Sequence, residues 1–297
     1  DAAFGLSYLL YDGGQRSARV SRARADLQAL GFQHNTTLQE VALRVAQSYY
    51  SLLASRWSLR VAEETVQNAE FHVRLARARF DNGLAPRSDL LKAETERADA
   101  FLSLVGARTT KRIAEGTLVS ALGLKVSKPI EIADIPESTY PLEVEDMGRL
   151  LEKAAKNRPE LLAAVAKVKS VESAIQEAES RYWPKVTANA GYGWVDDSFF
   201  PDHDQWSGGL KLSLPLFTGF KRGYQVEGAQ RDLDQARSDY AGRLRGVELE
   251  VWTAYWRFME AGEAIQAART FVASAEESAR LAEGEYKAGT GDIIALI

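Results

Sequence analysis

The stretch RYWPKVTANAGYGWVDDSFFPDHDQWSGGLKLSLPLFTGFKR, residues 181–222, decides the fold because its pattern differs from everything around it. Between residues 186 and 194, apolar side chains alternate with small or polar ones, which is the period of a β-strand. The apolar positions of this run are Val186, Ala188, Ala190, Tyr192 and Trp194. Because the alternation resumes after an acidic loop, we predict a β-hairpin over residues 185–217.

The second arm of this hairpin carries the stronger apolar row. Its apolar side has Trp206, Gly208, Leu210, Leu212, Leu214 and Leu216, and small or polar residues fill the positions between them. Strands of about 9–11 residues with one apolar and one polar side are typical of membrane-spanning β-barrels. We therefore predict that one face of the hairpin lies in lipid.

Long helices flank the hairpin. From Gln15 to Asp81 nothing breaks the helical pattern, which predicts a helix of about 100 Å at 1.5 Å per residue. Apolar residues recur there every seven positions, at Val45, Leu52, Leu59, Val66, Val73 and Phe80. The same spacing returns at Val251, Phe258, Ile265, Val272, Ala279 and Tyr286. These seams predict long antiparallel coiled-coil packing, and by themselves they also fit an ordinary soluble coiled coil.

Composition narrows the class of protein. The 297 residues carry a net charge of −4 without a dominant basic stripe, so we expect no nucleic-acid partner. Cysteine is absent, which excludes disulfides and thiolate metal sites. No run of about 18 apolar residues predicts a transmembrane helix. The chain starts at Asp1 within a strand pattern, and we interpret it as a fragment or a mature piece.

The chain matches itself at a constant offset of 206 residues, with residues 4–91 over 210–297 and no gap. This alignment pairs Leu6 with Leu212, Gly13 with Gly219, Tyr49 with Tyr255, and Gly83 with Gly289. A register held over this length predicts an internal duplication. We divide the chain into a first repeat (1–123), an irregular segment (124–157) and a second repeat (158–297). By the same offset, we expect a strand before residue 1 and a further helix after Ile297.

Two short stretches carry helix boundaries. In FDNGLAPRSDLLKAE, residues 80–94, Gly83 ends the long helix and Ser88 is predicted to cap a new one that starts at Asp89. In the run Asn-Arg-Pro-Glu, Asn157 is predicted to cap a helix with Pro159 in its first turn. That second helix is expected to end at residues 182–184, where the hairpin starts.

No catalytic or metal signature has credible spacing. The three histidines, at positions 34, 72 and 203, are scattered. The group Asp202-His203-Asp204 at the hairpin tip is more typical of a solvated acidic loop than of a metal site. There is no phosphate-binding loop, zinc motif or nucleophile elbow. We therefore expect no enzyme, no cofactor and no bound metal.

Taken together, the pattern resembles the TolC family of outer-membrane efflux proteins. The features that carry the resemblance are the duplication, the strand exit Pro215-Leu216-Phe217-Thr218-Gly219, the run Asn-Arg-Pro-Glu-Leu at 157–161, and the glycines at 83 and 289. The resemblance implies a homotrimer, in which each chain gives four strands to a shared 12-stranded barrel and its helices form a hollow α-barrel. It also implies a location in the outer membrane of a Gram-negative bacterium, with a long periplasmic part.

The resemblance implies roles for the two helix tips, where a periplasmic adaptor protein and an inner-membrane transporter would dock. Gly83, Leu84, Gly289 and Thr290 match adaptor-docking positions, and Ser88, Asp89 and Tyr286 match periplasmic gate positions. The chain departs from the family's name-giving member at two places. Gly291 stands where a latching arginine would be, and Ala295 where a pore-constricting aspartate would be. Asp89 is then the candidate constriction carboxylate, although an acidic residue in a first helical turn is equally consistent with a plain helix start.

Aromatic residues lie near the expected strand ends. They are Tyr182, Trp183, Tyr192, Trp194, Trp206 and Phe217. Interfacial aromatic girdles occupy these positions in membrane barrels, although single aromatics also occur on soluble sheets. We predict that these six form a membrane girdle in contact with outer-membrane lipid.

Two functions remain open at this point. The first is a passive exit duct of a tripartite efflux or type I secretion system, which crosses the periplasm and the outer membrane. The second is a soluble coiled-coil scaffold or adaptor with a small β cap. The row from Leu210 to Leu216 discriminates them, since it faces lipid in a duct and has no such need in a scaffold.

Overall fold

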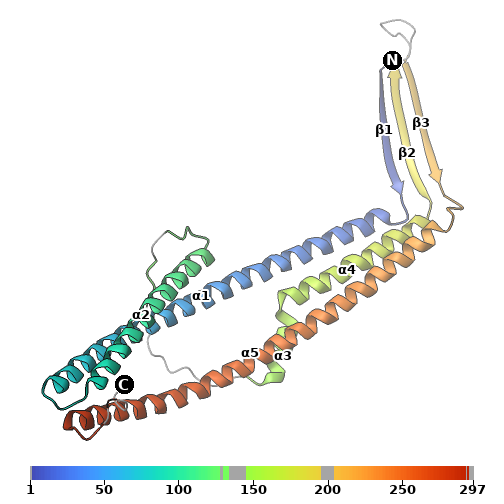
Figure 1. The fold of residues 1–297 in the computed structure, drawn as a ribbon. Coiled ribbons are helices and arrows are strands. Elements are labelled where there is room, and N and C mark those ends of the chain that lie inside the picture. Colours follow the sequence, from blue (N-terminus) through green and yellow to red (C-terminus); the bar gives the residue numbers. More distant parts are fainter. Residues whose placement is uncertain (1, 128–129, 134–144, 195–203, 292, 294–297) are drawn as a thin grey trace. The chain divides into compact units, whose positions relative to one another are not determined.

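The computed structural model describes residues 2–127, 130–133, 145–194, 204–291 and 293. In this part of the chain two long helices, α1 (Gln15–Asp81) and α5 (Lys221–Ala288), accompany three shorter ones (Figure 1). The shorter helices are α2 (Arg87–Ala121), α3 (Met147–Asn157) and α4 (Pro159–Glu179), and a 3-10 turn, η1 (Ser180–Tyr182), follows α4. The predicted helix from Gln15 to Asp81 is confirmed. None of the described helices has a stretch long and apolar enough to cross a membrane.

The predicted hairpin forms the larger part of a three-stranded antiparallel sheet. Its strands are β1 (Ala2–Tyr11), β2 (Lys185–Trp194) and β3 (Asp204–Ser213), in the order β1-β2-β3. The prediction that the last strand runs to residue 217 is wrong, because β3 ends at Ser213. Pro215 has no N–H to continue a ladder, and the carbonyl of Pro215 accepts a hydrogen bond from the Arg222 guanidinium instead.

The strand register gives the sheet two chemically different faces. Phe4 lies opposite Tyr192, which in turn lies opposite Trp206. Two residues along each strand, the same face continues with Leu6, Ala190 and Gly208, and then with Tyr8, Ala188 and Leu210. The other face carries small and polar residues such as Ser7, Asn189 and Gly209. Leu210 is 74% exposed, so the apolar face has no cover from the described part of the chain.

The chain divides into two compact units, and each long helix contributes to both. One unit contains residues 1–37 and 145–254, and the other contains residues 38–144 and 255–297. The first unit therefore holds the sheet with α3, α4 and the adjoining parts of α1 and α5. The second holds α2 with the remaining parts of the two long helices.

In the first unit, α4 contacts both long helices through polar side chains. On the α1 side, the Ser170 hydroxyl donates to Asp26 Oδ1 at 2.7 Å and Arg19 pairs with Glu177 at 2.7 Å. On the α5 side, Arg237 pairs with Glu172 at 3.4 Å. The hydrogen bond from Ser170 lowers the pKa of Asp26, and the positive charges of Lys167 and Arg22 act in the same direction against partial desolvation.

In the second unit, α2 packs back along α1 on the predicted seam. Leu52 on α1 is 2% exposed and packs with Ala114 and Leu118 of α2. Residues 130–133 cover this cluster from outside, where the carbonyl of Ala133 accepts a hydrogen bond from the Tyr49 hydroxyl at 2.9 Å. Small side chains such as Ala76 and Ala93 are fully buried, which lets the two helix backbones approach closely.

The equivalent seam on α5 is open along most of its length. Phe258, which the 206-residue offset pairs with Leu52, is 46% exposed, and Ile265 and Val272 are exposed as well. No element among the described residues covers this line as α2 covers α1. Packing along the seam is therefore confirmed for α1, whereas on α5 the seam is exposed from Phe258 to Val272 and packed only at its end, at Tyr286.

The helix start near Asn157 is confirmed, but its predicted cap is wrong. Asn157 is the last residue of α3, and its side-chain amide donates to the carbonyl of Lys153 at 2.9 Å. The N-cap of α4 is Arg158, whose guanidinium pairs with Glu160 at 3.0 Å. Because α3 runs directly into this turn, Asn157 has helical geometry and cannot cap the next helix.

The turn between β1 and α1 depends on a glycine. Gly13 has a φ of +68°, and a Cβ there would lie 2.5 Å from Trp183 Cβ and 2.7 Å from the carbonyl oxygen of Ser180. Gly219, its partner at the 206-residue offset, has a φ of +59° but has open space at the Cβ position. The two positions therefore share a backbone conformation and differ in their surroundings.

We expect Gly13→Ala to destabilise the protein more than Gly219→Ala. Left-handed backbone costs a residue with a side chain about 1–2 kcal/mol at either position. At Gly13, overpacking against Trp183 adds about 1–3 kcal/mol. Thermal unfolding of the two variants in detergent, followed by circular dichroism, measures the difference, and equal melting temperatures would contradict the contact with Trp183.

We also expect Asp26→Asn to reduce the dependence of the free energy of unfolding on pH in the acidic range. Folding lowers the pKa of Asp26 from its ordinary value of 3.8. The stabilisation by the carboxylate is therefore present above that value and is lost as the pH falls through the lower, folded-state pKa. The variant should be less stable than the parent at neutral pH and equally stable in strong acid. Asp232→Asn is the matched control, since Asp232 is the equivalent residue and has no ion pair in the described part of the chain.

Candidate functional site

The turn that joins α1 to α2 is built on Gly83. The Gly83 N–H donates to the carbonyl of Phe80 at 2.9 Å, and the Leu84 N–H donates to the carbonyl of Arg79 at 2.8 Å. This pair of bonds is the Schellman ending of a helix, which needs left-handed backbone at its glycine, and Gly83 has a φ of +70°. The Leu84 side chain is 69% exposed at the outside of the turn. The predicted adaptor-docking pair therefore lies at an accessible helix tip.

The end of α5 repeats this geometry. The Gly289 N–H donates to the carbonyl of Tyr286 at 3.2 Å, and the Thr290 N–H donates to the carbonyl of Glu285 at 3.0 Å. Gly289 has a φ of +82°, and the Thr290 hydroxyl also donates to the carbonyl of Glu285. Gly289 and Thr290 are both exposed, as Gly83 and Leu84 are.

Tyr286 lies in the packed interior of this tip region. Its side chain is only 1% exposed and packs in one cluster with Val73, Ala76, Ala93 and Ile293. The structure thus brings the predicted gate tyrosine together with residues of α1 and α2. As a buried anchor, Tyr286 fixes the end of α5 by apolar packing.

Ser88 and Asp89 lie in the first turn of α2. The helix starts at Arg87 with Pro86 as its N-cap, and no side chain caps it, so the prediction of a Ser88 cap is wrong. Pro86 has extended backbone (φ −72°, ψ 157°) that leads directly into the helix, which leaves Ser88 already inside the first turn. Asp89 is half-buried and its negative charge lies near the helix N-terminus, where the helix dipole stabilises it. Of the two departures noted in the sequence, Gly291 is half-buried, and Ala295 lies outside the described residues.

Arg79 is a tip residue that the sequence analysis missed. Its guanidinium lies 4.4 Å above the centre of the Tyr286 ring and donates hydrogen bonds to the carbonyls of Tyr286 and Leu84. An arginine in the last turn of a helix that ends at a glycine is a general sign of an interaction with free carbonyls. That signal was present at Arg79, but its partner is 207 positions away in the sequence.

The six predicted girdle aromatics fall into two groups at opposite ends of the sheet. Tyr182, Trp183 and Phe217 lie where β2 begins and after β3 ends, and all three are exposed. Tyr192, Trp194 and Trp206 lie at the far end, where the rings of Tyr192 and Trp194 are 5.0 Å apart with edge-to-face geometry. The structure brings these aromatics together in two bands, one at each end of the strands.

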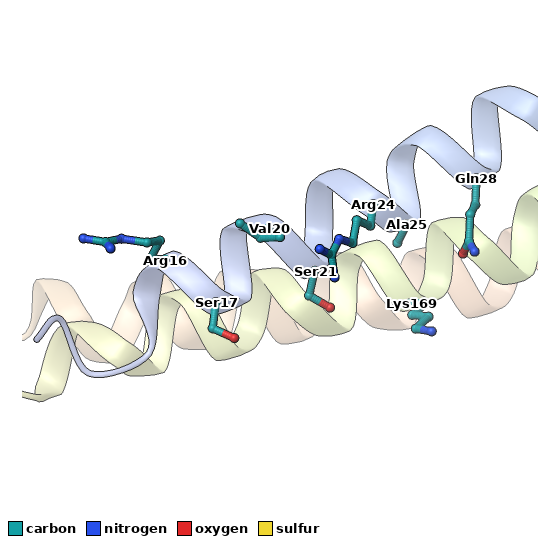
Figure 2. A pocket seen from close by; sticks show the side chains of 8 residues that line it. All are labelled: Arg16, Ser17, Val20, Ser21, Arg24, Ala25, Gln28 and Lys169. Atoms are coloured by element: carbon teal, nitrogen blue, oxygen red, sulfur yellow. The ribbon is translucent and has the colours of Figure 1, made fainter.

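A groove of about 590 Å³ runs along the first turns of α1, beside α4 (Figure 2). Arg16, Arg24 and Lys169 give it a positive charge, and two serines, a glutamine and two small apolar residues complete its lining. It is open to solvent and has no buried polar side chain. Its lining contains no histidine, cysteine, aspartate or glutamate, and no cluster of three or more such metal-ligating side chains occurs among the described residues. His203 of the acidic hairpin tip lies outside those residues.

The sequence is similar to a known protein family and to several of its members. The sequence profile of the family described as "Outer membrane efflux protein" matches residues 1–124 and 150–296. Protein CyaE of Bordetella pertussis is 27% identical over 243 residues, which are 78% of this chain and 51% of that protein. The outer membrane efflux protein BepC of Brucella suis biovar 1 is 23% identical over 91% of this chain and 59% of that protein.

The fold also matches solved structures. The outer membrane protein VceC from Vibrio cholerae superposes with a TM-score of 0.87 at 20% identity, over 99% of this chain and 71% of that one. The chain spans about half to three fifths of the length of CyaE and BepC. With a family profile matched over most of its residues, the chain belongs to the outer membrane efflux protein family.

Proposed function

We propose that the complete protein is a passive exit duct of a tripartite efflux or type I secretion system and that it works as a homotrimer. Family membership, which confirms the predicted outer-membrane location, supports this function. The family is one of outer-membrane efflux channels, which are not enzymes, and we propose that this chain likewise catalyses no reaction. An inner-membrane transporter would supply the energy and select the substrate, and a periplasmic adaptor would connect the two.

The observation that carries the proposal is the two-faced sheet with open edges. Its apolar face is exposed from Phe4 to Leu210, and a continuous exposed apolar patch marks a surface that contacts a partner or a membrane. Within the described residues, strands β1 and β3 each pair on one side only. Open edges are not tolerated in lipid, so the remaining backbone groups must pair with other strands. A 12-stranded barrel shared by three chains with four strands each supplies such strands and leaves no edge.

Two aromatic bands at opposite ends of the strands support the same function. They carry Tyr182, Trp183 and Phe217 at one end and Tyr192, Trp194 and Trp206 at the other. A strand of 10 residues such as β2 spans about 33 Å at 3.3 Å per residue, which suits the thickness of a bilayer. We propose that the two bands lie at the two interfaces of the outer membrane.

We propose that the chain is an internal duplication, divided into residues 1–123, 124–157 and 158–297. Equivalent contacts at the 206-residue offset support this division. The Arg16 guanidinium donates to the carbonyl of Leu9 at 3.0 Å, and the Arg222 guanidinium donates to the carbonyl of Pro215 at 2.6 Å. The Schellman turns at Gly83 and Gly289 are a second equivalent pair.

The tips are the proposed regulatory end of the duct. We propose that Gly83, Leu84, Gly289 and Thr290 form the adaptor-docking surface, since all four are exposed at helix ends. We propose Ser88, Asp89 and Tyr286 as the periplasmic gate. In that gate Asp89 supplies the charge of the constriction, and three copies around a threefold axis would favour cations in the closed state. Tyr286 anchors the end of α5.

The alternative is a soluble coiled-coil scaffold. The exposed seam of α5 from Phe258 to Val272 is compatible with it. However, a scaffold gives no reason for the apolar sheet face or for the two aromatic bands. Solubility of the complete protein without detergent would favour the scaffold.

We expect Asp89→Ala to raise the conductance of the closed duct in planar bilayers, because removal of three carboxylates widens and neutralises the constriction. Asp99→Ala is the matched control, since Asp99 is an exposed acidic residue further along α2. If Asp89→Ala conducts like the parent while the trimer still assembles, Asp89 only stabilises the start of its helix.

We expect replacement of Tyr182 and Trp183 by alanine to reduce the amount of assembled protein in the outer membrane. Interfacial aromatic rings stabilise the seating of a barrel in the bilayer, whereas docking takes place at the tips. Trp57→Ala serves as the control, because Trp57 is exposed on α1 in the other compact unit. If the variant without Tyr182 and Trp183 assembled normally in the membrane but lost adaptor binding, the proposed role of these aromatics would be contradicted.

A further inference from the structure

Arg79 joins the two helix tips of one chain. One nitrogen of its guanidinium, Nη1, donates to the carbonyl of Tyr286 at the end of α5. The other, Nη2, donates to the carbonyl of Leu84 in the α1–α2 turn at 3.4 Å. We propose that Arg79 is a positioning residue that clamps the two tip turns of a chain together and so holds the end of α5 in place.

The electrostatics of the site favour a cation in this place. The last carbonyls of a helix have no partner within the helix, and they give its C-terminus a partial negative charge. Arg79 lies at the ends of two helices at once, since Leu84 follows α1 and Tyr286 is near the end of α5. Its single positive charge therefore stabilises both ends, and separation of the tips would remove one of the two interactions.

The clamp acts on a rigid anchor. The Arg79 guanidinium lies over the Tyr286 ring at 4.4 Å, and a cation over an aromatic ring contributes about 0.5–2 kcal/mol. Tyr286 is itself buried with Val73, Ala76 and Ile293. Because the ring cannot move independently of this cluster, the arginine fixes the end of α5 relative to α1.

The geometry requires arginine rather than any cation. A guanidinium is a planar fork that can donate to two separate carbonyls while its face lies on a ring. A lysine ammonium is a compact charge at the end of a flexible chain, and it can reach one carbonyl without stacking in this way. A Cβ at Gly289 would lie 3.8 Å from Arg79 Nη2, an ordinary contact distance, so the fork itself does not require a glycine there.

The second repeat has no equivalent clamp. At the 206-residue offset, Arg79 corresponds to Glu285, an exposed residue whose carboxylate has no ion pair in the described part of the chain. A carboxylate cannot donate to helix-end carbonyls, so the interaction runs in one direction only, from the first tip to the second.

The clamp can be tested by distance measurement between spin labels on the complete protein. The chain described has no native cysteine, so Leu84→Cys and Thr290→Cys provide one label on each exposed tip turn, and excess unlabelled protein isolates the distance within one chain. We expect a narrow distance distribution with Arg79 present. Arg79→Ala should lose the narrow peak, and Arg79→Lys should not restore it.

Arg77→Ala is the matched control, because Arg77 is an exposed arginine on the same helix whose ion pair with Glu94 involves α2 and not α5. It should leave the distribution unchanged. An unchanged distribution in Arg79→Ala, in a variant with normal thermal unfolding, would overturn the clamp. Restoration of the narrow peak by Arg79→Lys would show that charge alone suffices and would overturn the fork geometry.

The distance measurement does not depend on channel activity, so the clamp and the proposed duct can fail separately. In planar bilayers, we expect Arg79→Ala to raise the frequency of openings. A broadened distance distribution without any ion conductance in the parent protein would support the clamp and count against the duct. A narrow distance distribution in an Arg79→Ala variant that still conducts ions would overturn the clamp and support the duct.

Discussion

The backbone hydrogen bonds of the sheet edges are the constraint on which the rest of the structure depends. One chain contributes three described strands, and β1 and β3 each have one side without a partner among the described residues. The exposed apolar face from Phe4 to Leu210 favours lipid, where an unpaired edge costs several kcal/mol for each polar group. The described strands therefore need further strands to pair with. The proposed trimer would supply them, and the long helices would then enclose a common axis.

The long helices have a different role, which is to hold the two tip turns in a defined arrangement. These turns are separated in sequence from the strands by the length of a long helix. In the unit that contains the tips, alanines such as Ala76 and Ala93 let α1 and α2 approach closely, and Tyr286 is packed against them. In the unit that contains the sheet, α4 contacts the long helices through polar side chains, such as the hydrogen bond from the Ser170 hydroxyl to Asp26. Apolar packing around Tyr286 keeps the end of α5 in a fixed place. Arg79 then links the two tip turns by donating to the carbonyls of Tyr286 and Leu84.

Much of this fold could be predicted from the sequence, because the patterns involved are local. The alternation from Val186 to Trp194 and the glycine at position 83 each specify their own element. The failures concern contacts that depend on the surroundings. Asn157 and Ser88 have the right chemistry for caps, but their backbones are already helical. Strand β3 ends early because Pro215 and Arg222 end the ladder. Arg79 could not be assigned, since its partner Tyr286 becomes a neighbour only in the folded chain.

The central claim is that this chain completes its sheet with other copies of itself inside a membrane. The most direct test is the mass of the complete gene product purified in detergent, measured by light scattering or native mass spectrometry. The proposed duct predicts a stable complex of three chains that precipitates when detergent is removed. A monomer that stays soluble without detergent would contradict the claim.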